Sequence, residues 1–193
     1  MTDLHAIPLL TRMFYFLRHG ETENNRRQLI AGSLDVELNE RGRAQAHAAV
    51  ALIAPLGITA IYSSGLKRTR DTAQPIADAL GLTVTPLAML NERNWGEFES
   101  QPRSTRARGI TPPGAETPQQ FAARTLAGFA SIAGIGVPLV VAHSGTYRVL
   151  CHHVGQDAGT EPVMNCHPVR FTPPADGGGA WRVEMLPHRA DHG

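Results

Sequence analysis

Short apolar runs alternate along the chain with longer segments in which apolar residues recur every three or four positions. Short runs are typical of buried strands, and the longer period is typical of helices with one buried face. The expected strands cover residues 13–17, 58–62, 82–87, 137–142, 170–172 and 181–186. The expected helices cover residues 40–54, about 65–80, 118–129 and 144–154. Strands that alternate with helices predict an α/β fold: a three-layer sandwich around a mainly parallel sheet.

Residues that favour helix ends support these boundaries. Asn39 and Thr117 stand where a side chain can cap the first turn, and Ser63 and Ser64 do so for the second helix. Residues 100–116 are rich in Pro, Gly, Ser and Arg and have no period, which indicates a loop. We therefore expect a short lid insertion at about residues 99–117.

Length and composition narrow the class of protein. A chain of 193 residues with 42% hydrophobic and 18% charged residues suggests one globular domain over 1–193. The net charge of +1 gives no general attraction to nucleic acid or membranes, and no apolar run is long enough to span a bilayer. The start of the chain lacks a basic leader, which indicates a cytoplasmic protein. The sequence leaves a homodimer open.

The cysteines and neighbouring histidines raise the question of a metal site. Cys151-His152-His153 and Cys166-His167 match no standard structural zinc spacing. Cys151 also shares an apolar helical face with Tyr147 and Val154, which favours a place in the core. We expect two reduced thiols, no metal and no cofactor.

Four polar clusters each follow an expected strand. They are Arg18-His19-Gly20, residues 63–68, residues 90–93 and His143-Ser144-Gly145. In an open parallel sheet the carboxyl ends of the strands form one edge, and ligands bind there. These clusters are therefore expected to converge on one crevice.

The residue types in these clusters suit phosphoryl transfer. Arg18 and Arg68 offer permanently charged forks for phosphate oxygens. A histidine can act as a nucleophile, and a glutamate can act as a proton donor. The chain contains no P-loop, dinucleotide fingerprint, zincin helix or serine-hydrolase elbow.

Several motifs along the chain resemble those of a known family. The segment Phe16-Leu17-Arg18-His19-Gly20-Glu21-Thr22 resembles the signature of the histidine phosphatase superfamily, in its phosphoglycerate mutase-like branch. Further matches follow in the family's order at Asn25, Ala31-Gly32, residues 39–42, residues 66–69, residues 72–73, residues 90–92 and residues 141–145.

The resemblance implies roles for particular residues. It makes His19 the nucleophile and Glu92 the general acid and later the base. The implied phosphate-binding residues are Arg18, Asn25, Ala31, Gly32, Arg68, His143 and Ser144. His143 is expected to be protonated. The implied substrate is a small phosphorylated metabolite, hydrolysed through a covalent phosphohistidine without a metal.

Each of these residues also has a purely structural interpretation. His19 and His143 could be buried histidines with satisfied hydrogen bonds, Glu92 a surface acid, and Arg68 a solvated helix arginine. The family usually has a longer helical insertion where residues 99–117 lie, and a mutase must keep water from its intermediate. The short lid therefore favours a phosphatase. The mutase-like tetrapeptide at residues 90–93 keeps a mutase as the alternative, and a non-catalytic phospho-ligand binder is a third reading.

The lid contains three arginines: Arg103, Arg106 and Arg108. They are either a solvated basic surface or contacts for a second anionic group on the substrate.

Overall fold

Six strands form one sheet at the centre of the molecule. The computed structural model describes residues 7–106, 109–160, 162–175 and 178–187. The strands are β1 (Phe14–Arg18), β2 (Ala60–Ser64), β3 (Val84–Leu87), β4 (Pro138–Ala142), β5 (Pro168–Thr172) and β6 (Arg182–Met185). Their order is β3-β2-β4-β1-β5-β6, and β3, β2, β4 and β1 run parallel. Strand β5 pairs antiparallel with β1, and β6 pairs antiparallel with β5. The expected mainly parallel sheet is confirmed.

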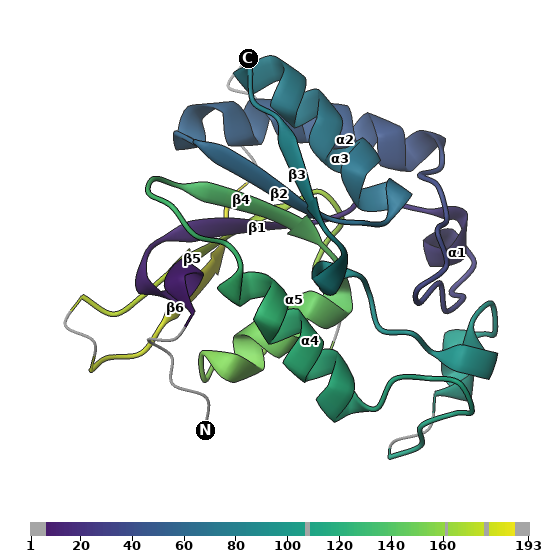
Figure 1. Cartoon of the computed structure of the whole chain (residues 1–193). Coiled ribbons are helices and arrows are strands. Elements are labelled where there is room, and N and C mark those ends of the chain that lie inside the picture. Colours follow the sequence, from purple (N-terminus) through teal and green to yellow (C-terminus); the bar gives the residue numbers. More distant parts are fainter. Residues whose placement is uncertain (1–6, 107–108, 161, 176–177, 188–193) are drawn as a thin grey trace.

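Helices cover both faces of this sheet. Helices α2 (Glu40–Ile53) and α3 (Lys67–Leu80) lie on one face, and α4 (Pro118–Ala130) and α5 (Ser144–His153) lie on the other (Figure 1). The expected three-layer α/β sandwich is thus confirmed. Short 3₁₀ turns occupy Pro8–Thr11, Ala54–Leu56, Ala88–Leu90, Gly96–Phe98 and Arg103–Thr105. Among the described residues, no helix combines the length and apolarity that crossing a membrane requires.

The central strands are buried on both faces. Along β1, Phe14 and Phe16 join the apolar cluster under α4 and α5, whereas Tyr15 and Leu17 join the cluster under α2 and α3. All five residues of β1 are buried, as are all five of β4. A strand covered by helices on both sides reads as a continuous apolar run, which is why the sequence pattern found both strands.

The start of α3 differs from the sequence expectation. Ser63 and Ser64 were expected to cap this helix, but both belong to β2, where Ser63 pairs with Val141 of β4. The residue before the helix is Leu66, which makes no side-chain capping bond. Ser64 Oγ still accepts a hydrogen bond from the Leu66 N–H at 3.2 Å. Sheet pairing therefore overrides the capping preference of serine.

A four-residue helix, α1 (Glu23–Arg26), was not expected. It is too short to show a hydrophobic period. Its signal is a capping box in which Thr22 and Asn25 each accept a hydrogen bond from the other's N–H, both at 3.2 Å. Each expected strand overlaps an observed one, with ends that differ by at most two residues.

Candidate active site

A cavity of about 400 Å³ lies at the carboxyl ends of the parallel strands. Eight residues to which the family resemblance assigns a role line it: Arg18, His19, Asn25, Ala31, Gly32, Arg68, Glu92 and Ser144. They come from segments more than 120 positions apart. The geometry therefore brings the polar clusters into one place, as the argument from parallel strands requires.

His19 follows β1 directly and is almost completely buried. Its N–H donates to the Ala142 carbonyl of β4 at 3.0 Å. The ring atom Nδ1 lies 2.7 Å from the Gly20 carbonyl, which can only accept, so Nδ1 carries the proton and Nε2 holds a lone pair. Burial, and next the charges of Arg68 and Arg18, hold the pKa of His19 well below its usual value. The ring is therefore a neutral imidazole at neutral pH.

The backbone around His19 is braced by three residues, of which only Asn165 lies outside the motifs matched in the sequence; the other two are Thr72 and Gly42. Thr72 Oγ1 accepts a hydrogen bond from the Gly20 N–H at 3.0 Å. Asn165 Nδ2 donates to the His19 carbonyl at 2.6 Å. A Cβ at Gly20 would lie 2.4 Å from the Gly42 carbonyl oxygen, so this close approach of two chain segments requires glycine. The nucleophile candidate is thus fixed on three sides.

Arg18 and Arg68 place two guanidinium groups at the cavity. Arg18 Nη1 donates to the Val163 carbonyl at 2.7 Å, and Arg68 donates to the carbonyls of Gly32 and Leu34 at 2.8 and 2.7 Å. The Nε atom of each arginine is buried without a hydrogen-bond partner among the described residues. Burial lowers the pKa of both arginines to about 10, so both remain charged at neutral pH. Neither forms an ion pair within the described part of the chain.

His143 is placed differently from the other residues of the expected pocket. It is fully buried beside His19, with ring centroids 5.3 Å apart, and it is absent from the cavity wall. Its Nε2 lies 2.8 Å from Ser64 Oγ, while Nδ1 has no partner among the described residues. Burial, and then Arg68, hold the pKa of His143 well below its usual value, so the expected protonated form is disfavoured before an anion binds.

Glu92 lies at the N-terminal end of α5. Its Oε2 accepts a hydrogen bond from the Gly145 N–H at 2.9 Å, and its Oε1 accepts one from the Arg93 N–H at 2.8 Å. A Cβ at residue 145 would lie 2.1 Å from Oε1, so a larger residue there would displace the Glu92 carboxyl group. The two main-chain donors fix the orientation of this carboxyl group on the cavity wall.

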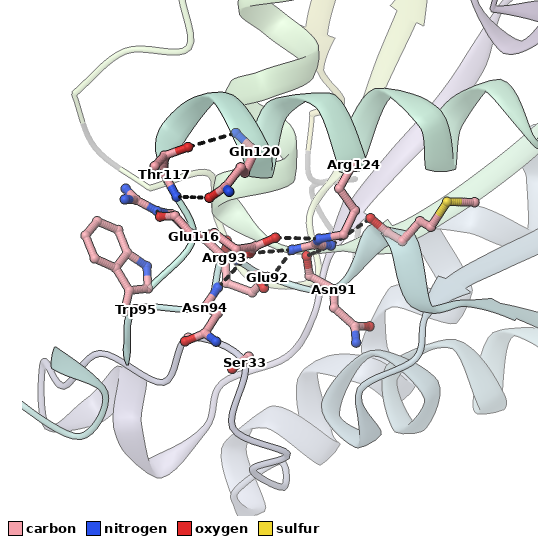
Figure 2. A network of polar contacts seen from close by, with 12 residues as sticks. Ser33, Asn91, Glu92, Arg93, Asn94, Trp95, Glu116, Thr117, Gln120 and Arg124 are labelled. Atoms are coloured by element: carbon pink, nitrogen blue, oxygen red, sulfur yellow. Dashed lines mark hydrogen bonds and ion pairs between the residues drawn. The ribbon is translucent and has the colours of Figure 1, made fainter. Parts of the chain in front are cut away.

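A polar network holds the segment that carries Glu92 (Figure 2). Arg124 of α4 binds both carboxylate oxygens of Glu116 at 2.7 Å and also donates to the Asn91 carbonyl at 3.0 Å. Glu116 in turn accepts from the Asn94 N–H at 2.9 Å. The network ties residues 91–94 to α4 from both sides of Glu92. Sequence reasoning missed it because it joins the Glu92 segment to residues 22 to 33 positions away.

The loop that carries Ala31 and Gly32 is tied to the lid. The Ile30 N–H donates to the Gln101 carbonyl at 2.9 Å. Glu99 Oε1 accepts from the Ser33 N–H at 2.7 Å. The expected loop at 100–116 contains one 3₁₀ turn and otherwise no helix within its described residues.

Two of the three lid arginines reach the cavity. Arg103 and Arg106 line it, whereas Arg108 lies outside the described residues. Arg93, Trp95 and Arg148 also line it. Arg93 belongs to the cluster at residues 90–93 that was expected here, whereas Trp95 and Arg148 were not identified, because their convergence depends on how the lid and α5 pack.

Neither cysteine lines this cavity. Cys151 and Cys166 are both buried free thiols, and Cys151 belongs to the core cluster under α4 and α5. Among the described residues, no group of three or more His, Cys, Asp or Glu side chains is arranged to hold a metal ion.

Comparisons with known proteins agree with this geometry. The family model of the histidine phosphatase superfamily (branch 1) matches residues 14–173. The probable phosphoglycerate mutase GpmB of Yersinia pestis (strain Pestoides F) is 46% identical over 88 residues, which span 46% of this chain and 41% of that protein.

Solved structures align over almost the whole chain. "Mycobacterial hydrolase 1" has a TM-score of 0.74 at 25% identity and covers 93% of this chain and 99% of its own. The mycobacterial glucosyl-3-phosphoglycerate phosphatase has a TM-score of 0.72 at 25% identity, with 90% and 97% covered. The chain belongs to the histidine phosphatase superfamily, whose members among these relatives are named as phosphatases and mutases.

Proposed function

We propose that this protein is a phosphatase that hydrolyses phosphate monoesters of small metabolites through a covalent phosphohistidine on His19, without a metal. The proposal rests on the protonation of the His19 ring and on the groups around it. Its Nδ1–H is held by the Gly20 carbonyl, which leaves a lone pair on Nε2. Its cavity also contains Arg18 and Arg68, which form no ion pair with any described residue. That arrangement suits a nucleophile attacking a bound phosphate.

In the proposed first step, Nε2 of His19 attacks phosphorus and the bond to the ester oxygen breaks. Arg18 and Arg68 stabilise the charge on the equatorial oxygens, which is the main catalytic contribution in phosphoryl transfer. Glu92 donates a proton to the departing alkoxide. The Gly20 carbonyl stabilises the positive charge that the ring gains, because it accepts the Nδ1–H bond throughout.

In the second step, water attacks the phosphohistidine. Glu92 takes a proton from the water, the N–P bond breaks, and inorganic phosphate leaves with His19 neutral again. We also assign His143, whose ring lies beside that of His19, to the stabilisation of the bound phosphate, whose negative charge would raise the pKa of His143. Asn25, Ala31, Gly32 and the start of α5 at Ser144 complete the proposed phosphate pocket.

The second candidate is a mutase. The name of the Yersinia relative favours it, although the match spans 41% of that protein. The short lid favours hydrolysis, since a mutase must shield its phosphoenzyme from water. A non-catalytic binder would not need a neutral histidine beside a positioned carboxyl group. Measuring phosphate release against phosphoglycerate interconversion on the same sample separates these candidates.

The test of the proposal is His19→Ala, with His47→Ala as its matched control because His47 is exposed on α2. The first variant should lose nearly all phosphatase activity and all acid-labile phosphate on the protein, while keeping its fold by circular dichroism. The control should retain both. Substantial turnover by folded His19→Ala protein would refute the assignment.

A further inference from the structure

The His143 ring is joined to a pair of buried hydroxyl groups that the steps above do not use. Its Nε2 lies 2.8 Å from Ser64 Oγ, and Ser64 Oγ lies 2.7 Å from Thr69 Oγ1. Thr69 Oγ1 in turn lies 2.7 Å from the Leu66 carbonyl oxygen and 3.1 Å from the Ser64 carbonyl oxygen. The side chains of His143, Ser64 and Thr69 are all fully buried. The contacts therefore run from the ring to the start of α3 without access to bulk water.

The carbonyl at the far end fixes the direction of the protons along this series. A carbonyl oxygen can only accept, so Thr69 donates its single hydroxyl proton to the main chain, where the Leu66 carbonyl is the closer acceptor. Thr69 Oγ1 then accepts the hydroxyl proton of Ser64. Ser64 Oγ also accepts the Leu66 N–H at 3.2 Å, and it has no second proton for the ring. Nε2 of His143 is therefore the donor to Ser64.

The opposite arrangement leaves a close contact without a proton. If Ser64 donated to the His143 ring, its contact with Thr69 would need the Thr69 proton. Thr69 Oγ1 and the Leu66 carbonyl oxygen would then lie 2.7 Å apart with no proton between them. A buried acceptor without a donor is costly, and bulk water does not reach this site to supply one. A donor at Nε2 of His143 satisfies every contact in the series.

We infer that Ser64 and Thr69 are positioning residues that hold the neutral His143 ring with its proton on Nε2 and a lone pair on Nδ1. His19 has the opposite tautomer, because its Nδ1 donates to the Gly20 carbonyl. The two adjacent rings therefore differ in the nitrogen that can take up a further proton. It is Nε2 in His19 and Nδ1 in His143.

The same two hydroxyl groups favour the charged form of His143, and this part of the inference rests on the proposed function. Burial, and after it the titratable groups that face the ring, lower the pKa of His143; these groups are Arg68 of α3, His19 and Arg18 at the end of β1, and Arg124 of α4. When bound phosphate favours the imidazolium, its Nε2–H needs an acceptor. Ser64 Oγ already supplies that acceptor, since its own proton is donated to Thr69.

The tautomer is measured from the imidazole nitrogen shifts of ligand-free protein labelled with ¹⁵N-histidine, at neutral pH. His143→Ala identifies the signals of this ring. We expect the proton on Nε2 in the wild-type chain. In Thr69→Val the Ser64 hydroxyl loses its acceptor and turns its proton to the ring, so the proton of His143 should move to Nδ1. Thr69→Ser, which keeps the hydroxyl, should retain the proton on Nε2.

A matched control separates this effect from the loss of a buried hydroxyl in general. Thr125 of α4 is as fully buried as Thr69, and its Oγ1 has no hydrogen-bond partner among the described residues. Thr125→Val should therefore leave the His143 tautomer as it is in the wild-type chain.

The pH profile of kcat on an aryl phosphate supplies a second measurement. Loss of one hydrogen bond to a charged group corresponds to a pKa change of about one unit. Ser64→Ala and Thr69→Val each weaken the imidazolium of His143, so the alkaline limb of the profile should move about one pH unit lower. Thr69→Ser should restore the wild-type limb, and Thr125→Val should not move it. A loss of stability alone would reduce the amount of active protein without moving the limb.

A wild-type ring with its proton on Nδ1, or a Thr69→Val variant that keeps the proton on Nε2, would overturn the assigned tautomer. An alkaline limb that stays in place in both Ser64→Ala and Thr69→Val would overturn the role of the pair in the reaction. Failure of the proposed function has a separate signature, which is turnover by folded His19→Ala protein. It leaves the tautomer measurement unaffected, because no substrate is present in that experiment.

Discussion

Replacing Arg124 tests whether the network around Glu92 serves catalysis as well as stability. In Arg124→Ala, Glu116 loses two short hydrogen bonds, and three main-chain carbonyls lose a donor, those of Met89, Asn91 and Glu92. The side chains of Arg124 and Glu116 are only 27% and 22% exposed, so water replaces these partners incompletely.

The expected loss of stability lies between two limits. An exposed ion pair contributes about 0–1 kcal/mol, whereas breaking a fully buried pair costs about 3–5 kcal/mol. For this partly buried pair we expect about 2–3 kcal/mol in the free energy of unfolding. Arg170→Ala is the control, because Arg170 and Glu184 form an exposed pair at 2.8 Å, and it should cost less than about 1 kcal/mol.

The effect on catalysis should depend on the leaving group. If Glu92 protonates the departing alkoxide, loosening residues 91–94 should slow alkyl phosphates by about 10- to 100-fold, since a displacement of about 1 Å can cost about 100-fold. An activated aryl phosphate, which needs no proton, should be slowed much less. In a Glu92→Gln background, Arg124→Ala should cause little further loss of kcat on alkyl phosphates. Equal losses on both substrates, or full additivity in the double variant, would show that Arg124 does not act through Glu92.

Three further predictions follow from the site. Glu92→Gln should slow alkyl phosphates by about 100-fold or more and aryl phosphates less, and the assignment fails if single-turnover phosphorylation slows equally on both. Activity should survive exhaustive chelation; loss of activity that zinc or magnesium restores would reveal a metal requirement. Burial holds the pKa of His19 and His143 well below that of the unfolded chain, so the unfolded state binds more protons below about pH 6.5. The free energy of unfolding should therefore fall as pH drops, by up to about 1.4 kcal/mol per pH unit for each histidine. His19→Ala should reduce that slope in denaturation series at pH 7 and pH 5, and an unchanged slope would contradict the reasoning.

The sequence predicted those features that follow from local apolar patterns, namely the central strands and the residues at their ends. The central strands β1 and β4 are apolar without interruption because both faces are covered, and Arg18, His19 and Ser144 follow from where these strands end. What it missed depends on tertiary packing. Ser64 looks like a helix cap, but neighbouring strands on both sides keep it in β2, where its hydroxyl meets His143.

Local sequence patterns also could not predict the contacts between distant segments. Asn165 reaches the His19 carbonyl only because the chain returns across β1 after α5. Trp95 and Arg93 gain their partner Arg106 only when the lid folds back toward the cavity. The position of His143 behind the cavity wall likewise depends on side-chain packing that no spacing reveals.

The attachment of β1 has a consequence for how such a protein can diversify. The strand lies between β4 and β5, so the end that bears His19 is anchored from both sides. The lid that supplies Arg103 and Arg106 lies outside the sheet and meets the rest through loop contacts such as that between Leu29 and Pro102. We expect insertions and deletions in this lid to change the cavity wall without displacing His19. The strand end that positions His19 and the lid that shapes the cavity wall are therefore separate segments of the chain, and each can change while the other is kept.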